Sequence, residues 1–107
     1  FLNVYHHGKS YANRYLVMYI LKNGSSNSSS NNRYGITVSK KVGNSVVRHR
    51  VTRLIRESIR LNEEKFARGY DIVIIARNTA KGKKYSDIAS AFLHLGKMHK
   101  VLRDDQL

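Results

Sequence analysis

The segment 40–57, KKVGNSVVRHRVTRLIRE, constrains the fold more strongly than any other part of the chain. Its apolar residues recur at the three- and four-residue spacing of a helix with one buried stripe. We predict a helix over 44–67, with Asn44 or Ser45 as its N-cap and Gly69 as its stop signal. The expected buried stripe is Val47, Val51, Leu54, Ile55, Ser58 and Leu61. Because such a stripe must be buried against another layer, the helix is expected to pack on a sheet.

The other side of this predicted helix is strongly basic. The residues placed there are His49, Arg50, Arg53, Arg56 and Arg60, with Arg48 at the border. A helix that is merely solvated typically mixes both signs of charge in i,i+4 pairs, whereas here five arginines accompany only Glu57. Arginine binds phosphate oxygens in a bidentate manner, so the pattern favours a surface for a polyanion.

The net charge of the whole chain is +13, from 20 Lys and Arg against 7 Asp and Glu. Such an excess destabilises a compact state by self-repulsion and is typical of proteins that bind a nucleic acid backbone. An anionic membrane surface is the main alternative. The sequence contains no run of about 18 apolar residues, which is the length needed to span a membrane. The absence of cysteine fits a reducing cytosol, so we expect a cytoplasmic protein. The chain starts at Phe1 without a methionine, and further N-terminal residues are expected to precede it.

The rest of the sequence predicts a single α+β domain over 1–107. The expected elements, in order, are a short helix stopped by Gly8, a strand over 15–21, a strand over 33–38, the basic helix, a strand over 70–76 and a helix over 86–102 capped by Ser86. The expected inner residues of this last helix are Ile88, Ala89, Phe92, Leu95 and Met98 or His99. The stretch 23–32 is low in complexity and is expected to be a flexible loop. The strand over 70–76, YDIVIIA, is almost continuously apolar and is therefore predicted to be central in the sheet.

No catalytic group emerges from the residue pattern. The few acids give no identifiable pair for acid/base catalysis, and no two histidines stand at the i,i+4 spacing of a helical zinc pair. We therefore predict neither a catalytic residue nor a metal or cofactor site on the protein alone. The aromatic residues Phe1, Tyr5, Tyr15 and Tyr19 are compatible with two interpretations, a place in the core or a surface on which unpaired bases stack.

Three stretches, HHGKSYANRYL, VSKKVGNSVVRHRVTRLIRE and GYDIVIIARNTA, together resemble the protein subunit of bacterial ribonuclease P over nearly the whole chain. The resemblance implies an αβββαβα sandwich, in which a four-stranded sheet is packed by helices and contains a left-handed βαβ crossover. It also implies a role in removing the 5′ leader from precursor tRNA. In that family the RNA subunit performs the Mg²⁺-dependent hydrolysis, and the protein binds this RNA and the single-stranded leader.

The resemblance also assigns candidate contacts. Those to ribonuclease P RNA are Lys40, Lys41, Asn44, Arg48, His49, Arg50, Arg53, Arg56 and Arg60. Those to the leader of precursor tRNA, in and beside an aromatic cleft, are Phe1, Tyr5, Lys9, Asn13, Arg14 and Tyr19. The loop 77–84 is a weaker candidate for RNA contact. Neither a membrane nor DNA is implied as a partner.

Two positions depart from the family pattern. The signature of the basic helix usually has Asn between two arginines, where this chain has His49, and Thr52 stands where a Lys is common. Histidine can still donate and accept hydrogen bonds at position 49, but its charge, unlike that of the neighbouring arginines, depends on pH. A structural RNA-binding protein of ribosomal type is the alternative function, since it shares the charge and the α+β order but does not need an aromatic cleft. A free-standing nuclease would need catalytic acids or histidines that the sequence does not assemble.

Overall fold

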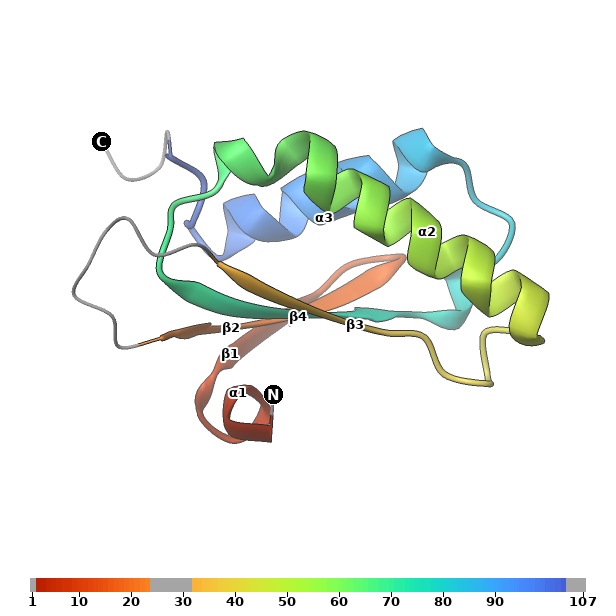
Figure 1. The fold of residues 1–107 in the computed structure, drawn as a ribbon, viewed down its shortest axis with the longest axis horizontal. Helices are drawn as coiled ribbons and strands as arrows, with labels where there is room; N and C mark the ends of the chain where they lie inside the picture. Colours follow the sequence, from red (N-terminus) through yellow and green to blue (C-terminus); the bar gives the residue numbers. More distant parts are fainter. Residues whose placement is uncertain (1, 24–31, 104–107) are drawn as a thin grey trace.

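The computed structural model describes residues 2–23 and 32–103 of the chain. The helices are α1 (Leu2–His7), α2 (Ser45–Asn62) and α3 (Tyr85–Met98), and the strands are β1 (Lys9–Ala12), β2 (Leu16–Lys22), β3 (Arg33–Thr37) and β4 (Tyr70–Ala76). Single 3₁₀ turns follow α2 at Glu63–Lys65 and β4 at Asn78–Ala80. The predicted αβββαβα order is confirmed, and the strands form one sheet in the order β1-β2-β4-β3 (Figure 1).

Strand β4 lies in the interior of this sheet. It pairs with β2 in antiparallel fashion, Leu16 opposite Ala76, and with β3 in parallel fashion, Tyr34 opposite Ile72. Ile72, Val73 and Ile74 are all buried, because elements pack on both faces of the sheet at this strand. A strand buried on both faces carries a continuous apolar run, so its central place was correctly predicted.

The parallel strands β3 and β4 are joined through α2. In Figure 1 both strands run from left to right with β3 nearer the viewer, while α2 returns above them. This path is a left-handed crossover, as the family resemblance implied. About 98% of such connections are right-handed, so the geometry is a distinguishing property of the fold.

The two faces of the sheet are covered unequally. Helices α2 and α3 pack on one face, and α1 lies against the other (Figure 1). Leu16, Met18 and Ile20 point from β2 into the core under α2 and α3, as their alternation predicted. On the opposite face, which we call the α1 face, Val4 is buried at only 1% exposure and anchors the short helix.

Helix α2 begins as predicted but ends earlier. The Asn44 side chain accepts a hydrogen bond from the Val47 amide at 3.0 Å and thereby caps the first turn. The predicted extension to residue 67 is wrong, because the chain turns at Asn62 so that Phe66 can enter the core and stack on Phe92, with ring centroids 4.8 Å apart. Gly69, at φ 96°, belongs to the turn before β4 instead of stopping the helix.

The buried stripe of α2 also differs from the prediction at its end. Leu61 is 48% exposed, whereas Ile59 and Asn62 are buried. The Asn62 side-chain amide donates to the Ser58 carbonyl oxygen at 2.9 Å, and the Ser58 hydroxyl donates to Leu54 at 2.8 Å. Because each polar side chain donates a hydrogen bond to a backbone carbonyl of the preceding helical turn, both side chains can face the core.

Helix α3 begins one residue before the predicted cap. Its N-cap is Lys84, not Ser86, and the Lys84 amide donates to the Asp87 carboxylate at 3.1 Å. The helix ends at Met98, before Lys100 adopts a positive φ of 58°. Ile88, Phe92 and Leu95 are buried as predicted, but Ala91 and Gly96 are buried in place of Ala89. Of the predicted flexible loop 23–32, residues 24–31 lie outside the described residues.

Candidate nucleic-acid interface

The solvent-facing side of α2 forms a basic surface, which we call the basic helix surface. Its exposed cations are Arg50, Arg53, Arg56 and Arg60, and the exposed side chain of His49 lies on the same helix. Glu57 is the single acid of the helix, and its pKa is lowered chiefly by hydrogen bonds from the Arg60 guanidinium. Because Glu57 already pairs with Arg60, the positive charge that remains for a partner centres on Arg50, Arg53 and Arg56.

Two shallow hollows of about 510 Å³ each mark this surface. One is lined by Ser45, Val46, His49, Arg50 and Arg53, and the other by Arg50, Arg53, Leu54 and Glu57. Arg50 and Arg53 belong to both hollows, so either guanidinium can reach a group that enters either one. The 76% exposed Val46 adds an apolar contact beside these donors, which suits a sugar or a base next to a phosphate.

The remaining candidates for RNA contact lie at the start of α2 and in the turn before it. Lys40 and Lys41 are exposed in the turn that leads into the helix. The Asn44 side-chain oxygen is occupied by the cap, so its amide nitrogen is the group left for a partner. Arg48 is partly buried, and its Nε is buried without a hydrogen-bond partner among residues 2–23 and 32–103. The structure therefore gathers all nine predicted RNA-contact positions along one helix and its entry turn.

The α1 face carries an aromatic pair from two distant parts of the sequence. The rings of Tyr5 in α1 and Tyr19 in β2 meet edge to face, with centroids 5.0 Å apart. Tyr5 is 39% exposed, so part of its ring is available to solvent or to a base. The predicted partner Phe1 lies outside the described residues. The structure thus brings two of the three predicted aromatic residues together.

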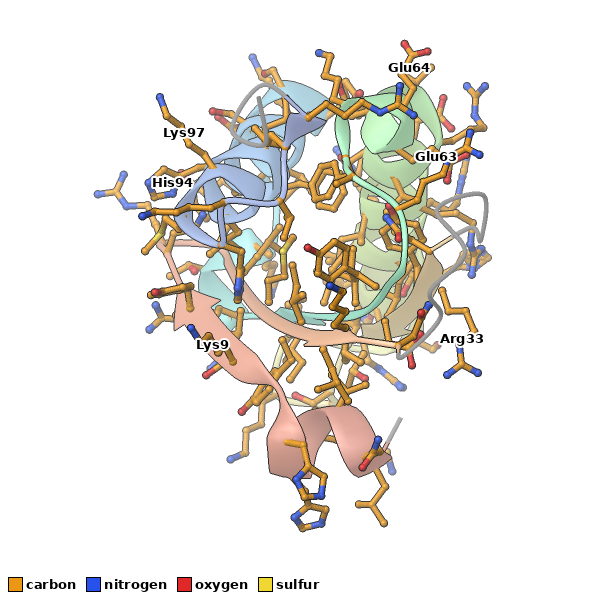
Figure 2. The ribbon with its side chains drawn as sticks, turned by 90° about the vertical axis from the view of Figure 1, so that its left-hand side faces the viewer. Lys9, Arg33, Glu63, Glu64, His94 and Lys97 are labelled. Atoms are coloured by element: carbon orange, nitrogen blue, oxygen red, sulfur yellow. The ribbon has the colours of Figure 1, made fainter. Side chains whose placement is uncertain are left out.

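The other three predicted leader contacts lie elsewhere. Lys9 pairs with Ile20 across β1 and β2, so it points to the α3 side of the sheet, at the edge opposite Arg33 (Figure 2). The Asn13 side chain accepts from the Leu16 amide at 3.0 Å and donates to the Ala91 carbonyl at 2.9 Å. The structure does not place Lys9, Asn13 or Arg14 beside the aromatic pair, and their contact with a leader stays a prediction.

Tyr15 corresponds to the first of the two interpretations left open for the aromatic residues, a place against the core. It packs against the core at the start of β2, and the Lys83 ammonium lies 5.5 Å from the centre of its ring.

One ion pair near the α1 face was not predicted from the sequence. Arg33 donates two hydrogen bonds to the Asp71 carboxylate, at 2.9 and 2.5 Å, across the β3–β4 pair. These bonds are the main cause of the lowered pKa of Asp71. The Asp71 carboxylate therefore stays ionised, and the positive charge of Arg33 compensates its negative charge. This ion pair limits the repulsion that Asp71 would otherwise exert on an anionic ligand.

The described residues contain no group of three acids or histidines that could hold a metal ion. Within the same part of the chain, no helix is both long and apolar enough to cross a membrane. The basic helix surface offers hydrogen-bond donors and positive charge, and the α1 face offers the Tyr5–Tyr19 pair.

Comparison with known proteins shows which family has these features. A sequence model of the family described as Ribonuclease P matches residues 1–100. The Ribonuclease P protein component of Lachnoclostridium phytofermentans is 59% identical over 106 residues, covering 99% of this chain and 88% of the relative. That of Clostridioides difficile is 54% identical over 98 residues, covering 91% and 82%.

Solved structures agree with the sequence comparison. The RNase P protein from Staphylococcus aureus is similar with a TM-score of 0.82 and 35% identity, covering 95% of this chain and 90% of that one. The RNase P protein from Thermotoga maritima gives a TM-score of 0.80 and 31% identity, covering 91% and 88%. The chain therefore belongs to the family of ribonuclease P protein components.

Proposed function

We propose that this chain assists removal of the 5′ leader from precursor tRNA as the protein component of ribonuclease P. Its basic helix surface would bind the catalytic RNA, and its α1 face would bind the single-stranded leader. The observation that carries the proposal is the division of binding groups between two places, arginines on α2 and the Tyr5–Tyr19 pair on the opposite face of the sheet. Family membership does not favour the alternative of a ribosomal-type structural protein.

The contribution of the protein would be binding and charge screening. A precursor tRNA and a large RNA repel each other, and each phosphate neutralised by Arg or Lys releases condensed counterions. Holding the leader would also restrict the scissile phosphate to the reactive geometry, which reduces the entropic part of the barrier. Mg²⁺ ions held by the RNA would supply the activated water and stabilise the developing charge.

The aromatic pair predicts a leader-dependent effect of Tyr5→Ala. With a leader of about ten nucleotides, the dissociation constant of the reconstituted enzyme for precursor tRNA is expected to rise about tenfold, because one stacked base contributes about 1–3 kcal/mol. With a leader of a single nucleotide no change is expected. The measurement is a binding titration with both substrates in Ca²⁺, in which cleavage is slow.

The matched control is Tyr11→Ala. Tyr11 has nearly the same exposure as Tyr5, 41% against 39%, but its ring contacts His99 on the α3 side of the sheet. We expect this control to leave the affinity for both substrates unchanged. Equal losses with long and short leaders in Tyr5→Ala would rule out a leader contact at the α1 face.

A further inference from the structure

Three segments that are distant in the sequence are tied together at the end of the molecule where β4 ends and α2 begins (Figure 1). The Arg77 amide donates to the Tyr15 carbonyl at 2.9 Å, and the Arg77 guanidinium donates to Asn13 at 2.7 Å. The Thr79 hydroxyl donates to the Arg14 carbonyl, and Arg50 of α2 reaches the Lys83 carbonyl at 3.4 Å. The turn 13–15, the loop 77–84 and the start of α2 therefore form one preorganised surface.

This surface, which we call the turn–loop cluster, concentrates positive charge. Its cations are Arg14, Arg50, Arg77, Lys81, Lys83 and Lys84. None of the six forms an ion pair in the described part of the chain, where the ion pairs are Arg33–Asp71 and Arg60–Glu57. The segments are fastened by backbone carbonyls rather than by acids, so the fold assembles this charge without neutralising it. Self-repulsion of this kind is relieved when an anion binds.

A hollow of about 640 Å³ adjoins the cluster, between the turn 13–15 and the outer side of α3. It is lined by Asn13, Arg14, Tyr15, Ser86, Asp87, Ser90, Ala91 and His94. The Asn13 side-chain oxygen already accepts two backbone amides, so its amide nitrogen donates to His94 Nδ1 at 3.2 Å. The hollow thus offers the Tyr15 ring, two serine hydroxyls, one free ring nitrogen of His94 and the Asp87 carboxylate beside the cations of the cluster, which suits the base of an unpaired nucleotide.

We propose that the turn–loop cluster is a second RNA contact, which binds the phosphodiester backbone of ribonuclease P RNA and receives an unpaired nucleotide of that RNA in the adjoining hollow. Arg50 belongs both to this cluster and to the basic helix surface, so one RNA strand can follow both without a break. The aromatic pair assigned to the leader lies on the other face of the sheet, which is why the catalytic RNA is the partner here. The proposal thereby assigns Asn13 and Arg14 to the catalytic RNA in place of the leader contact predicted for them. The inference rests on the function proposed above.

The test is a pair of double variants with the same change of charge. Lys81 and Lys84 are exposed cluster cations, and Lys22 and Lys97 are exposed cations outside it. Binding of ribonuclease P RNA is measured over a KCl series at constant Mg²⁺. For Lys81→Ala/Lys84→Ala we expect about tenfold weaker binding and a log–log salt slope shallower by about 1–2, as for two lost phosphate contacts. For Lys22→Ala/Lys97→Ala we expect less than about a twofold change in binding.

The hollow is tested separately by Ser90→Trp. Ser90 is exposed on α3, so the large side chain fills the hollow without entering the core. We expect severalfold weaker binding with an unchanged salt slope, because a nucleotide is excluded while the phosphate contacts remain. Unchanged affinity of this variant would overturn the nucleotide site.

Other results would overturn the second contact itself. Equal losses in the two double variants would show a general effect of charge. If the cluster variant weakened only the binding of precursor tRNA by the assembled enzyme, the cluster would contact precursor tRNA, and the proposed contact with ribonuclease P RNA would be wrong. If the unaltered protein bound ribonuclease P RNA no more tightly than an unrelated RNA of equal length, the proposed function would fail, and this choice of partner would fail with it.

Discussion

Replacing Arg53 and Arg56 together by alanine is expected to weaken binding of ribonuclease P RNA by about a hundredfold. Both side chains are exposed on α2, and Arg53 lines both hollows of the basic helix surface. A hydrogen bond to a charged group contributes about 1.5–3 kcal/mol, so two lost guanidinium–phosphate contacts account for about this effect. The apolar stripe of α2 is untouched, and the fold should remain as stable as before.

The measurement is a salt titration of RNA affinity combined with thermal unfolding monitored by circular dichroism. The log–log slope is expected to become shallower by about two, since two phosphates are no longer neutralised. Arg60→Ala is the informative control on the same helix, because Arg60 already pairs with Glu57 and its loss should matter less. A weakened affinity with an unaltered slope would mean that Arg53 and Arg56 do not contact phosphates.

Gly8→Ala is expected to detach α1 from the sheet and to abolish the preference for long leaders. A Cβ at this position would lie 2.5 Å from the Val4 carbonyl oxygen and 2.8 Å from that of Ile20. Both atoms belong to the backbone and cannot rotate away, so we expect a loss of about 1–3 kcal/mol in the free energy of unfolding. Because Tyr5 is carried by α1, its ring would move away from Tyr19.

Two measurements check this expectation, chemical denaturation of the protein and precursor tRNA binding with long and short leaders. Gly69→Ala provides the control, because Gly69 has a φ of 96° but open space around its missing Cβ. Strain in that conformation costs about 1–2 kcal/mol without disturbing α1. The control should lose stability and keep the leader preference. If Gly8→Ala also kept that preference, α1 would have no part in leader binding.

The sheet and its burial follow from sequence periodicity. The alternation of Leu16, Met18 and Ile20 indicates a strand with one face in a core, and the run of β4, apolar after Asp71, indicates a strand buried on both faces. The handedness of the crossover is different, because no local spacing distinguishes a left-handed from a right-handed path. That feature came only from the family resemblance.

The helix ends could not be derived in the same way. A helical wheel counts apolar residues, and it therefore favoured Leu61 over Asn62 for the buried stripe of α2. Ser58 is buried as predicted, but Asn62 is buried because its side-chain amide bonds to the Ser58 carbonyl one turn earlier, and a wheel does not represent such a bond. The end of α2 is set by the need of Phe66 to reach Phe92, which is a tertiary contact.

The candidate sites also differ in whether local residue spacing or tertiary contacts bring their residues together. The cations of α2 share one helix face, so their grouping follows from residue spacing alone. Lys9 is separated from the aromatic pair because the register of β1 against β2 places it opposite Ile20, on the α3 side of the sheet. A four-residue exposed strand carries no alternation from which that register could be derived. The turn–loop cluster, likewise, depends on bonds between residues more than 60 positions apart.

Reconstitution of the enzyme tests the central claim most directly. The protein is mixed with a bacterial ribonuclease P RNA and precursor tRNA at a Mg²⁺ concentration too low for the RNA to act efficiently alone. We predict that the protein stimulates cleavage at the 5′ end of the mature tRNA and lowers the dissociation constant for the substrate, because its cations replace part of the screening that Mg²⁺ provides. Cleavage and substrate affinity that do not change when the protein is added would contradict the account.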